Sequence, residues 1–172
     1  MNLEFKELQK EDIKEVISII NEAYRGERKN NAWTTESHLL SGIRVNENMM
    51  KEILEEKNTK TYIVKAENKV IGTVQAKLDG ENIHIGLFAV DTKSQASGIG
   101  KKLLEFAENS SSKLWQKSTF IMEVISSRTE LMHYYIRRGY QNTNSFIEFP
   151  KSEYWTPNTN EELKLLVLKK TI

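Results

Sequence analysis

The sequence predicts a mixed α/β domain in which an antiparallel meander of strands precedes strand–helix–strand crossovers. Three apolar runs, residues 59–67, 70–78 and 82–90, are joined by short turns, which is typical of antiparallel neighbours. The last run leads through a glycine-containing turn into a helical pattern after Gly100, and a second helical pattern at 129–138 lies between further strands. Such crossovers are right-handed. The meander excludes a purely parallel, doubly wound sheet.

The N-terminal third predicts one strand followed by three helices. A short strand is expected over residues 3–8. Asp12 is expected to cap an amphipathic helix that ends at Gly26. The following residues are less regular, and a short helix over residues 34–40 is expected there, capped by one of its two threonines. A further helix is expected over residues 47–56, with its methionines, isoleucine and leucine on the buried side.

Beyond the meander, the expected elements alternate between helix and strand. In chain order they are a helix after Gly100, a serine linker at 110–112, a strand at 119–124, a helix at 129–138, strand residues from 140 to 149, a loop at 150–157 and a last strand at 163–168. Glycine at position 139 closes the second of these helices. The strand–helix–strand pattern predicts a second crossover directly beside the first.

Composition restricts the class of protein. The 172 residues fit one domain, residues 1–172, with 38% apolar and 28% charged residues. The net charge of +1 argues against nucleic-acid binding, and no apolar run approaches the roughly 18 residues of a membrane span. The absence of cysteine excludes disulfides, thiolate metal sites and a cysteine nucleophile. Three scattered histidines predict no metal site, and the charged N-terminus is not a signal peptide, so a cytoplasmic location is expected.

Residues 83–108 contain a strand, a glycine turn and a helix in succession, an arrangement that binds anions. The strand ends at Val90, and Gly98 and Gly100 open the helix. The first N–H groups of a helix lack backbone partners and carry partial positive charge, and glycine lets the backbone approach a ligand. Residues 95–100 are therefore a candidate phosphate or pyrophosphate cradle, although ordinary turns share this spacing. The P-loop and dinucleotide-binding patterns are missing.

The same spacing resembles the acetyl-CoA motif of the GNAT superfamily of N-acetyltransferases. In that motif a strand ending in valine precedes a short turn, and [Q/R]-x-x-G-x-[G/A] opens a helix. The matching residues here are Val90, Gln95, Gly98 and Gly100. Ser97 stands where members often carry Arg or Lys, so backbone amides are expected to make most of the phosphate contacts.

A second stretch adds to the resemblance. The family pattern Y-x-x-x-G-[FY] is matched by Tyr135, Gly139 and Tyr140, whereas Tyr134 is one residue off the motif and is expected on another face. Arg128 stands where members often have an asparagine that holds the pantetheine arm or a water molecule. The resemblance implies a GNAT-like mixed α/β (α+β) fold with helices on both faces of the sheet.

The resemblance also implies an activity and its cosubstrate. The expected reaction is acetyl transfer from acetyl-CoA to the primary amine of a small molecule, by direct attack in a ternary complex. A protein or peptide amine is the alternative acceptor, and a non-catalytic acyl-CoA-binding module is the alternative function. A monomer or homodimer is expected. The residues expected to bind acetyl-CoA are Phe88, Ala89, Val90, Gln95, Ala96, Ser97, Gly98, Ile99, Gly100, Lys101, Arg128 and Tyr135.

Acetyl transfer needs an acid, a base and an oxyanion donor. Tyr135 is the candidate acid because a phenol is protonated at neutral pH, although it could instead be a core tyrosine. A backbone N–H near Val90 is the candidate oxyanion donor, and the resemblance implies a bulge in this strand. Members of the resembled family that use a carboxylate base on this strand place it eleven residues before the Gln/Arg of the phosphate loop. That position here is His84, the candidate base, with Glu123 or a water chain as alternatives. In an unbroken strand, His84 shares a face with Phe88.

The acceptor is expected to lie against the region between the first strand and the sheet. In the family this region commonly walls the acceptor pocket, and here it contains Trp33, Glu36 and Arg44. These three residues are the candidate substrate-binding set. The alternative is structural, with Trp33 covering the core and Arg44 capping a helix end.

Overall fold

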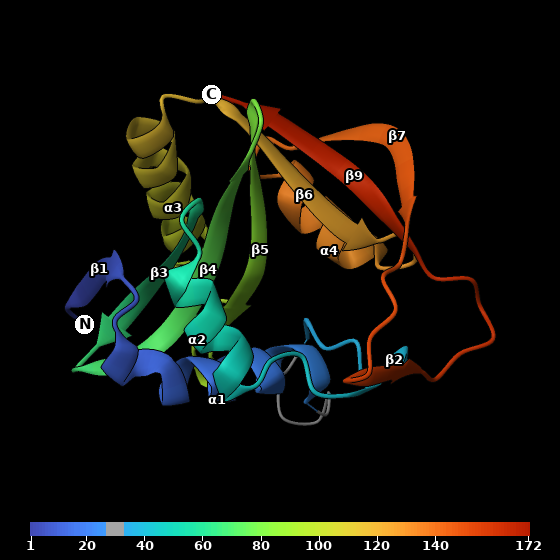
Figure 1. Ribbon diagram of the computed structural model, residues 1–172, viewed down its shortest axis with the longest axis horizontal. Helices are drawn as coiled ribbons and strands as arrows, with labels where there is room; N and C mark the ends of the chain where they lie inside the picture. The colour runs from blue at the N-terminus through green and yellow to red at the C-terminus, as the bar shows by residue number, and fades with distance from the viewer. Residues whose placement is uncertain (27–32) are drawn as a thin grey trace.

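Seven strands form one twisted sheet with helices packed on both of its faces in the computed structural model, which describes residues 1–26 and 33–172 (Figure 1). Its described strands are β1 (Leu3–Glu7), β2 (Leu40–Gly42), β3 (Thr59–Ala66), β4 (Lys69–Asp79), β5 (Asn82–Val90), β6 (Thr119–Ile125), β7 (Gln141–Glu148), β8 (Trp155–Pro157) and β9 (Lys164–Thr171). Its described helices are α1 (Ile13–Arg25), α2 (Glu47–Glu55), α3 (Ile99–Trp115) and α4 (Thr129–Ile136), with short 3-10 turns η1 (Lys10–Asp12) and η3 (Thr92–Ser94).

The predicted meander is confirmed. Strands β3, β4 and β5 are consecutive antiparallel neighbours, and β1 pairs antiparallel with the outer edge of β3. The turn between β4 and β5 contains Gly80 at a φ of 59°, a conformation that glycine adopts without strain. Apolar alternation therefore located this half of the sheet to within a few residues.

Strand β5 contains a bulge at Leu87. Gln75 of β4 pairs with Gly86, but Thr73, only two residues away, pairs with Ala89, so β5 has one extra residue. Leu87 absorbs this residue at a φ of 44°, a strained conformation for a leucine. The bulge that the sequence resemblance implies is therefore present.

The bulge exchanges the two faces of β5. Ile83 and Ile85 pack in the core beneath α3, whereas Leu87 packs in the core beneath α1 and α2. Phe88 packs against the α3 core, so it lies on the face opposite to that of His84. The expectation that His84 and Phe88 share a face is thus wrong, because it assumes an unbroken two-residue alternation.

Strands β5 and β6 are parallel neighbours only near their beginnings. Three residue pairs join them, from Asn82–Thr119 to His84–Ile121. Farther along, the strands diverge, as Figure 1 shows below their junction. The crossover through α3 is the predicted strand–helix–strand unit, and the divergence leaves a space between the two strands at the level of the bulge.

The second crossover differs from the prediction. The strand order is β5-β6-β9-β7, so β9 separates β6 from β7 and pairs antiparallel with both. The expected direct neighbourhood of the strands before and after α4 is therefore wrong. Sequence order favours adjacent placement, but the apolar strand β9 finds two partners in this position and buries Leu166 and Leu168.

Two local expectations are also wrong. Residues 34–40 form turns instead of a helix and lead into β2, which pairs with β8 in a small separate sheet. The serines at 110–112 lie inside α3 instead of forming a linker. Ser111 is buried there because its hydroxyl donates a 2.6 Å hydrogen bond to the Ala107 carbonyl one turn earlier.

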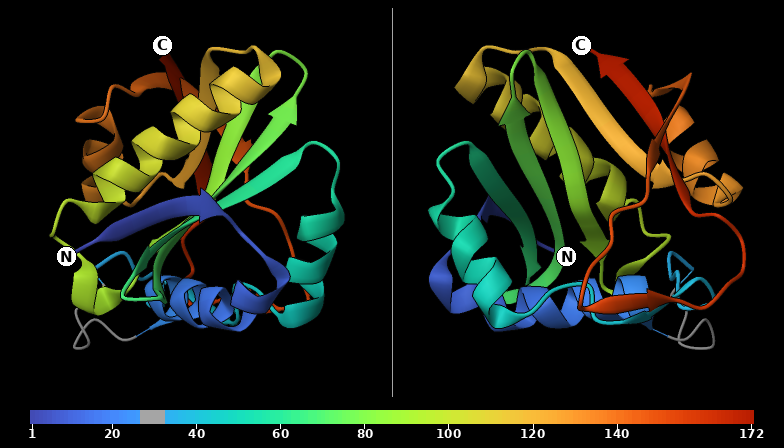
Figure 2. Two further views of the ribbon diagram at one scale, coloured as in Figure 1. Left: turned by 90° about the vertical axis from the view of Figure 1, so that its left-hand side faces the viewer. Right: turned by 45° about the vertical axis from the view of Figure 1, so that its right-hand side comes forward.

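The helices divide the core into two layers. Residues of α3 and α4 pack with one face of the sheet, and residues of α1 and α2 pack with the other face (Figure 2). Sheet β2–β8 adds a small apolar cluster around Leu40 and Leu165 at the far end of β6 and β9. Among the described residues, no helix has the length and apolar character needed to cross a membrane.

Candidate active site

Two cavities meet where β5 and β6 diverge. The loop cavity, of about 550 Å³, lies between the residues before α3 and the face of α4. The strand cavity, of about 300 Å³, lies between β5 and β6 and extends to the end of α1. The residues that line both cavities are Tyr24, Phe88, Arg128, Leu131 and Tyr135. A molecule in the loop cavity and one in the strand cavity would therefore meet at these side chains.

The loop before α3 is built to approach an anion. Ala96 and Gly98 have φ values of 63° and 78°, and no side chain caps the first turn of α3. A Cβ on Gly98 would meet nothing within 4 Å, so this backbone faces open space. Gln95 fixes the loop by donating a 3.0 Å hydrogen bond to the Val90 carbonyl, and its buried Oε1 has no partner among the described residues. Free first-turn amides in this setting fit a phosphate or pyrophosphate group.

Some predicted loop residues do not reach the cavity. Gln95, Ala96, Gly98, Gly100 and Lys101 line it, as do Phe88, Ala89 and Val90 at the end of β5. Ser97 is exposed and donates its hydroxyl hydrogen to the Ser94 carbonyl, whereas Ile99 is buried in the core. Neither Ser97 nor Ile99 lines the loop cavity.

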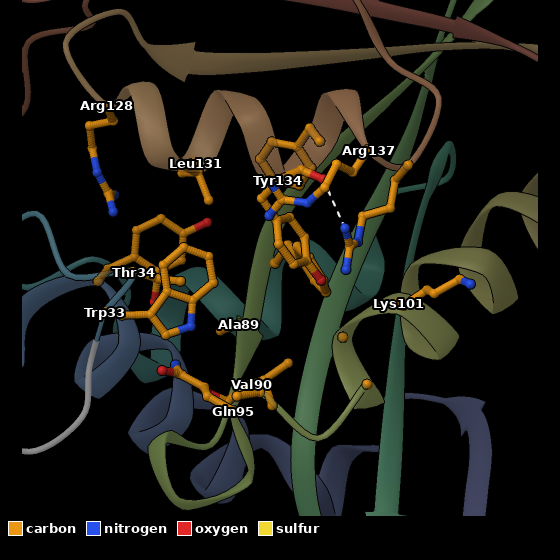
Figure 3. A pocket seen from close by; sticks show the side chains of 17 residues that line it. Trp33, Thr34, Ala89, Val90, Gln95, Lys101, Arg128, Leu131, Tyr134 and Arg137 are labelled. Atoms are coloured by element: carbon orange, nitrogen blue, oxygen red, sulfur yellow. Dashed lines mark hydrogen bonds between the residues drawn. The ribbon is translucent and has the colours of Figure 1, made fainter.

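Two arginines that the sequence analysis did not select line the loop cavity. Arg137 and Arg138 follow α4, and the Arg138 guanidinium lies 3.6 Å from the centre of the Tyr134 ring. Its Nη1 also donates a 3.0 Å hydrogen bond to the Tyr134 carbonyl, drawn as a dashed line in Figure 3. Their position directly before Gly139 is the sequence signal that could have identified them. They add positive charge where Lys101 is already present.

Aromatic rings form one wall of the loop cavity. The Trp33 and Tyr134 rings are 5.7 Å apart although they come from distant segments (Figure 3). Tyr134, which the sequence predicts on another face from Tyr135, lines the same cavity. Its hydroxyl would be 2.7 Å from a Cβ placed on Gly100. Trp33 is thus separated from Glu36 and Arg44, which line the strand cavity.

Tyr135 lies at the junction of the two cavities. Its side chain is buried, and its ring packs against those of Phe88 and Tyr140 at centroid distances of 6.2 and 6.1 Å. Burial raises the pKa of the Tyr135 phenol well above its ordinary value, so the hydroxyl stays protonated and can donate a proton or a hydrogen bond.

A second tyrosine at the junction was not selected from the sequence. Burial raises the pKa of Tyr24, and the Phe88 backbone N–H, next to the β5 bulge, partly offsets this by facing its phenol oxygen. The Phe88 amide therefore points to a polar atom at the meeting point of the cavities. Tyr24 follows the apolar stripe of α1, and its place at the end of that helix was the available signal.

The two candidate bases are neighbours in the strand cavity. His84 Nδ1 lies 3.7 Å from Glu123 Oε1, and His84 Nε2 lies 3.8 Å from Asp79 Oδ2. The side chains of His84 and Glu123 are about one-third exposed, so a proton taken up here can pass to solvent. Because β5 and β6 pair at this level, the parallel crossover brings together two residues 39 positions apart.

A buried cluster of charges forms the other end of the strand cavity. Glu36 forms an ion pair with Arg25 and lies 3.8 Å from Arg128, and all three side chains are only 8% exposed. The Arg44 guanidinium lies 5.4 Å from the Tyr24 ring centre and 5.8 Å from that of Trp155. The small β2–β8 sheet positions Trp155 here, a placement that the sequence pattern does not reveal.

The described residues do not form a set of ligands for a metal ion. Within residues 1–26 and 33–172, no group of three or more His, Cys, Asp or Glu side chains is arranged to hold a metal ion. The side chains that line both cavities instead carry two phenols and one guanidinium, and the strand cavity adds one imidazole and two carboxylates. This set can hold and move protons and can stabilise negative charge on an oxygen.

Comparison with protein-family models identifies one family. Residues 9–154 match the family model described as an acetyltransferase (GNAT) domain. The comparison with curated proteins finds no match. Among solved structures, the ribosomal-protein-S18-alanine N-acetyltransferase from Escherichia coli is similar with a TM-score of 0.70 and 14% identity, covering 99% of this chain and 94% of that chain.

Two further structures are similar over the full length. The PaiA N-acetyltransferase from Thermoplasma acidophilum in complex with coenzyme A has a TM-score of 0.67 and 14% identity, with 100% of both chains covered. A spermidine N-acetyltransferase chimera from Vibrio cholerae and hSSAT has a TM-score of 0.70 and 13% identity, covering 99% of this chain and 96% of that chain. Identities at this level establish a common fold.

Proposed function

Because this chain belongs to the GNAT family of acetyltransferases, we propose that it transfers the acetyl group of acetyl-CoA to the primary amine of a small molecule. The observation that carries the proposal is the meeting of two cavities at Tyr135 and the β5 bulge. One cavity has the anion-binding loop that a CoA pyrophosphate requires, and the other has candidate proton acceptors. Direct transfer in a ternary complex needs this side-by-side arrangement.

The residues of the loop cavity fit acetyl-CoA. The uncapped first turn of α3 and the open backbone at Gly98 would hold the pyrophosphate, and Lys101, Arg137 and Arg138 would add positive charge. The apolar and aromatic wall formed by Phe88 and the Trp33–Tyr134 pair suits the pantetheine arm. Acetyl-CoA supplies the activated thioester carbonyl when it is bound.

Three groups at the junction would act on the reacting atoms. The Tyr135 hydroxyl donates to the departing sulfur, since its raised pKa keeps the phenol protonated. Backbone N–H groups near the end of β5, after the bulge, stabilise negative charge on the acetyl oxygen, an effect worth about 3 kcal/mol per donor. His84, with Glu123 beside it, accepts the proton of the amine directly or through water.

The small-molecule acceptor is favoured by the shape of the strand cavity. Its volume of about 300 Å³ suits a molecule of amino-acid or polyamine size. Trp155 and the buried ion pairs of Glu36 close the end away from the bases. A protein N-terminus or lysine side chain is the second candidate, because two structural neighbours are ribosomal-protein alanine N-acetyltransferases.

Calorimetry followed by a turnover screen tests the proposal. Acetyl-CoA and free CoA are titrated into the protein, and a panel of small amines and short peptides is then screened with thiol release as the readout. Saturable CoA binding with turnover of small amines is the expected result. Turnover of peptides alone would replace the small-molecule acceptor with a protein acceptor. CoA binding without turnover on any amine would identify a non-catalytic module, and no CoA binding would refute the cofactor site.

A further inference from the structure

We propose that the acceptor amine carries a carboxylate, which is held at the closed end of the strand cavity by Arg25, Arg44 and Trp155. This inference rests on the proposed acetyltransferase function and names the class of its substrate. The amine would lie toward His84 and Glu123, and the carboxylate toward the end of α1. An amino acid, or an amine of similar size that bears a carboxylate, has both groups.

The charge of the described cavity lining favours an anion. Its cationic residues are Arg25, Arg44, Lys77 and Arg128, and its acidic residues are Glu36 and Glu123. Glu36 is engaged by two of the arginines, and Lys77 lies 3.2 Å from Glu56 outside the cavity lining. No described carboxylate lies within ion-pair distance of Arg44, which instead rests near two aromatic rings. A ligand carboxylate would neutralise this excess of positive charge.

Two buried donors belong to side chains that line the same end of the cavity. Arg25 Nε and Trp155 Nε1 are both shielded from solvent, and neither has a hydrogen-bond partner among the described residues. Both side chains line the strand cavity, and the Arg25 guanidinium lies 6.0 Å from the Trp155 ring centre. A buried donor without a partner is destabilising, and a carboxylate has enough lone pairs to accept from several such donors.

The arrangement of charge along the cavity separates two ligand groups. The His84–Glu123 end can accept protons, whereas at the other end Arg25 and Arg44 donate and the carboxylate of Glu36 is already engaged by Arg25 and Arg128. A polycation such as a polyamine would place a second ammonium group beside these guanidinium groups, where no further carboxylate lies among the described residues that line the cavity. Like-charge contact of this kind selects against polycations. A carboxylate-bearing amine satisfies both ends.

Matched pairs of amines test the proposal with the whole protein. Lysine is compared with cadaverine, phenylalanine with phenethylamine, and γ-aminobutyrate with propylamine, so that each pair differs by one carboxylate. At saturating acetyl-CoA, the carboxylated member of at least one pair is expected to have a kcat/KM at least tenfold higher. Equal or higher kcat/KM for the amine that lacks the carboxylate, in every pair that turns over, would overturn the inference while leaving the acetyltransferase function intact.

Variants test whether the preference for the carboxylated amine depends on the Arg25–Arg44 end of the strand cavity. Arg44→Gln is expected to lower the preference for the carboxylated amine about tenfold or more, and Arg44→Lys to restore part of it. Trp155→Phe keeps the ring but removes the Nε1 donor, and a smaller loss of preference is expected. Lys14→Gln, on the exposed face of α1, removes the same charge away from both cavities and is the matched control. An unchanged preference in both Arg44→Gln and Trp155→Phe would refute the assignment.

Equilibrium binding tests the inference without any need for turnover. Each amine of the three pairs is titrated calorimetrically into the CoA-saturated protein. Tighter binding of the carboxylated member, weakened in Arg44→Gln but not in Lys14→Gln, supports the inference even if no amine is acetylated. Equal affinity within every pair, or no binding of any carboxylated member, overturns it.

Discussion

The Tyr135 hydroxyl is within reach of both a thioester and an acceptor amine, since Tyr135 lines both cavities. Tyr135→Phe removes this donor but keeps the ring in its aromatic contacts. A fall in kcat of about 10²-fold or more is expected, with little change in acetyl-CoA affinity, because the hydroxyl acts on the leaving sulfur. Steady-state kinetics and calorimetry measure the two quantities.

A matched substitution distinguishes the specific fall in kcat of Tyr135→Phe from a general effect of removing a buried tyrosine hydroxyl. Tyr62→Phe removes a phenol hydroxyl from the α3 core, away from both cavities, and leaves kcat unchanged. If Tyr135→Phe retains the wild-type kcat, then another group protonates the sulfur.

The pH dependence of kcat follows from the protonation state of the Tyr135 phenol. Burial raises the pKa of Tyr135, so its protonated form persists to higher pH than that of a free tyrosine, which ionises near pH 10. Loss of the acid therefore causes no fall in kcat between about pH 7 and about pH 10. A pH profile of kcat checks this expectation. A descending limb in this range that disappears in Tyr135→Phe would show that the phenol ionises earlier.

Motif spacing identified the residues that lie near each other in sequence, and three-dimensional structure was needed for the others. Gln95, Gly98 and Tyr135 were found because each sits at a fixed distance from a glycine that opens or closes a helix. Trp155 was not found because its place depends on the pairing of β8 with β2, two short strands more than 110 residues apart. Arg25 was not found because a cation at a helix end is ordinarily a solvated side chain.

The loop before α3 depends on glycine at one position. Gly98 has a φ of 78° in open space, so Gly98→Ala adds backbone strain of about 1–2 kcal/mol without a steric clash. Relief of this strain moves the amides that face the phosphate, and CoA affinity is expected to fall about five- to tenfold. Calorimetric titration with CoA measures the loss.

Gly80 provides the comparison for that substitution. Gly80→Ala introduces a similar strain, at a φ of 59° and also in open space, but in the β4–β5 turn. Both variants lose stability in denaturant unfolding, and only Gly98→Ala loses CoA affinity. Equal CoA affinity in the two variants would mean that this loop does not bind the cofactor.

The periodicity of apolar residues predicted the helices and strands that bury one face. It did not predict segments whose structure depends on pairing with a distant part of the chain. The meander and helices α1, α2 and α4 match their expected ranges within a few residues. Residues 34–40 are turns because they lead into β2, whose partner β8 is remote in sequence. The serines of α3 were mistaken for a linker because serine competes with helical hydrogen bonds, although Ser111 satisfies its hydroxyl within the helix. The β5 bulge has no composition signal at all.

At the scale of the whole molecule, one buried carboxylate connects α3 to the far half of the sheet. Glu108 accepts a 3.0 Å hydrogen bond from the Tyr140 hydroxyl and lies 2.6 Å from Lys170 of β9. Burial raises the pKa of Glu108, and Lys170 and Tyr140 partly offset this rise. Glu108→Ala leaves a buried hydroxyl and a half-buried ammonium group without their partner. The free energy of unfolding is expected to fall by about 2–3 kcal/mol.

Denaturant unfolding measures this loss against a neighbour on the same helix. Glu105 is exposed and lies 3.9 Å from Lys101, an ion pair worth less than about 0.5 kcal/mol. Glu105→Ala is therefore expected to be nearly neutral. If the two variants were equally stable, Glu108 would not join α3 to the sheet.

The position of β9 constrains how the protein is made in the cell. Because β9 lies between β6 and β7, both of those strands expose unpaired edges until residues 164–171 have left the ribosome. A partly synthesised chain can form the meander and α3, but it cannot complete the half of the sheet that supports α4 and Tyr135. During translation the nascent chain therefore carries an open, apolar sheet edge, which is the feature that chaperones recognise and that promotes aggregation. Catalytic competence therefore requires β9, because Leu166 and Leu168 of this strand belong to the core against which Tyr135 packs.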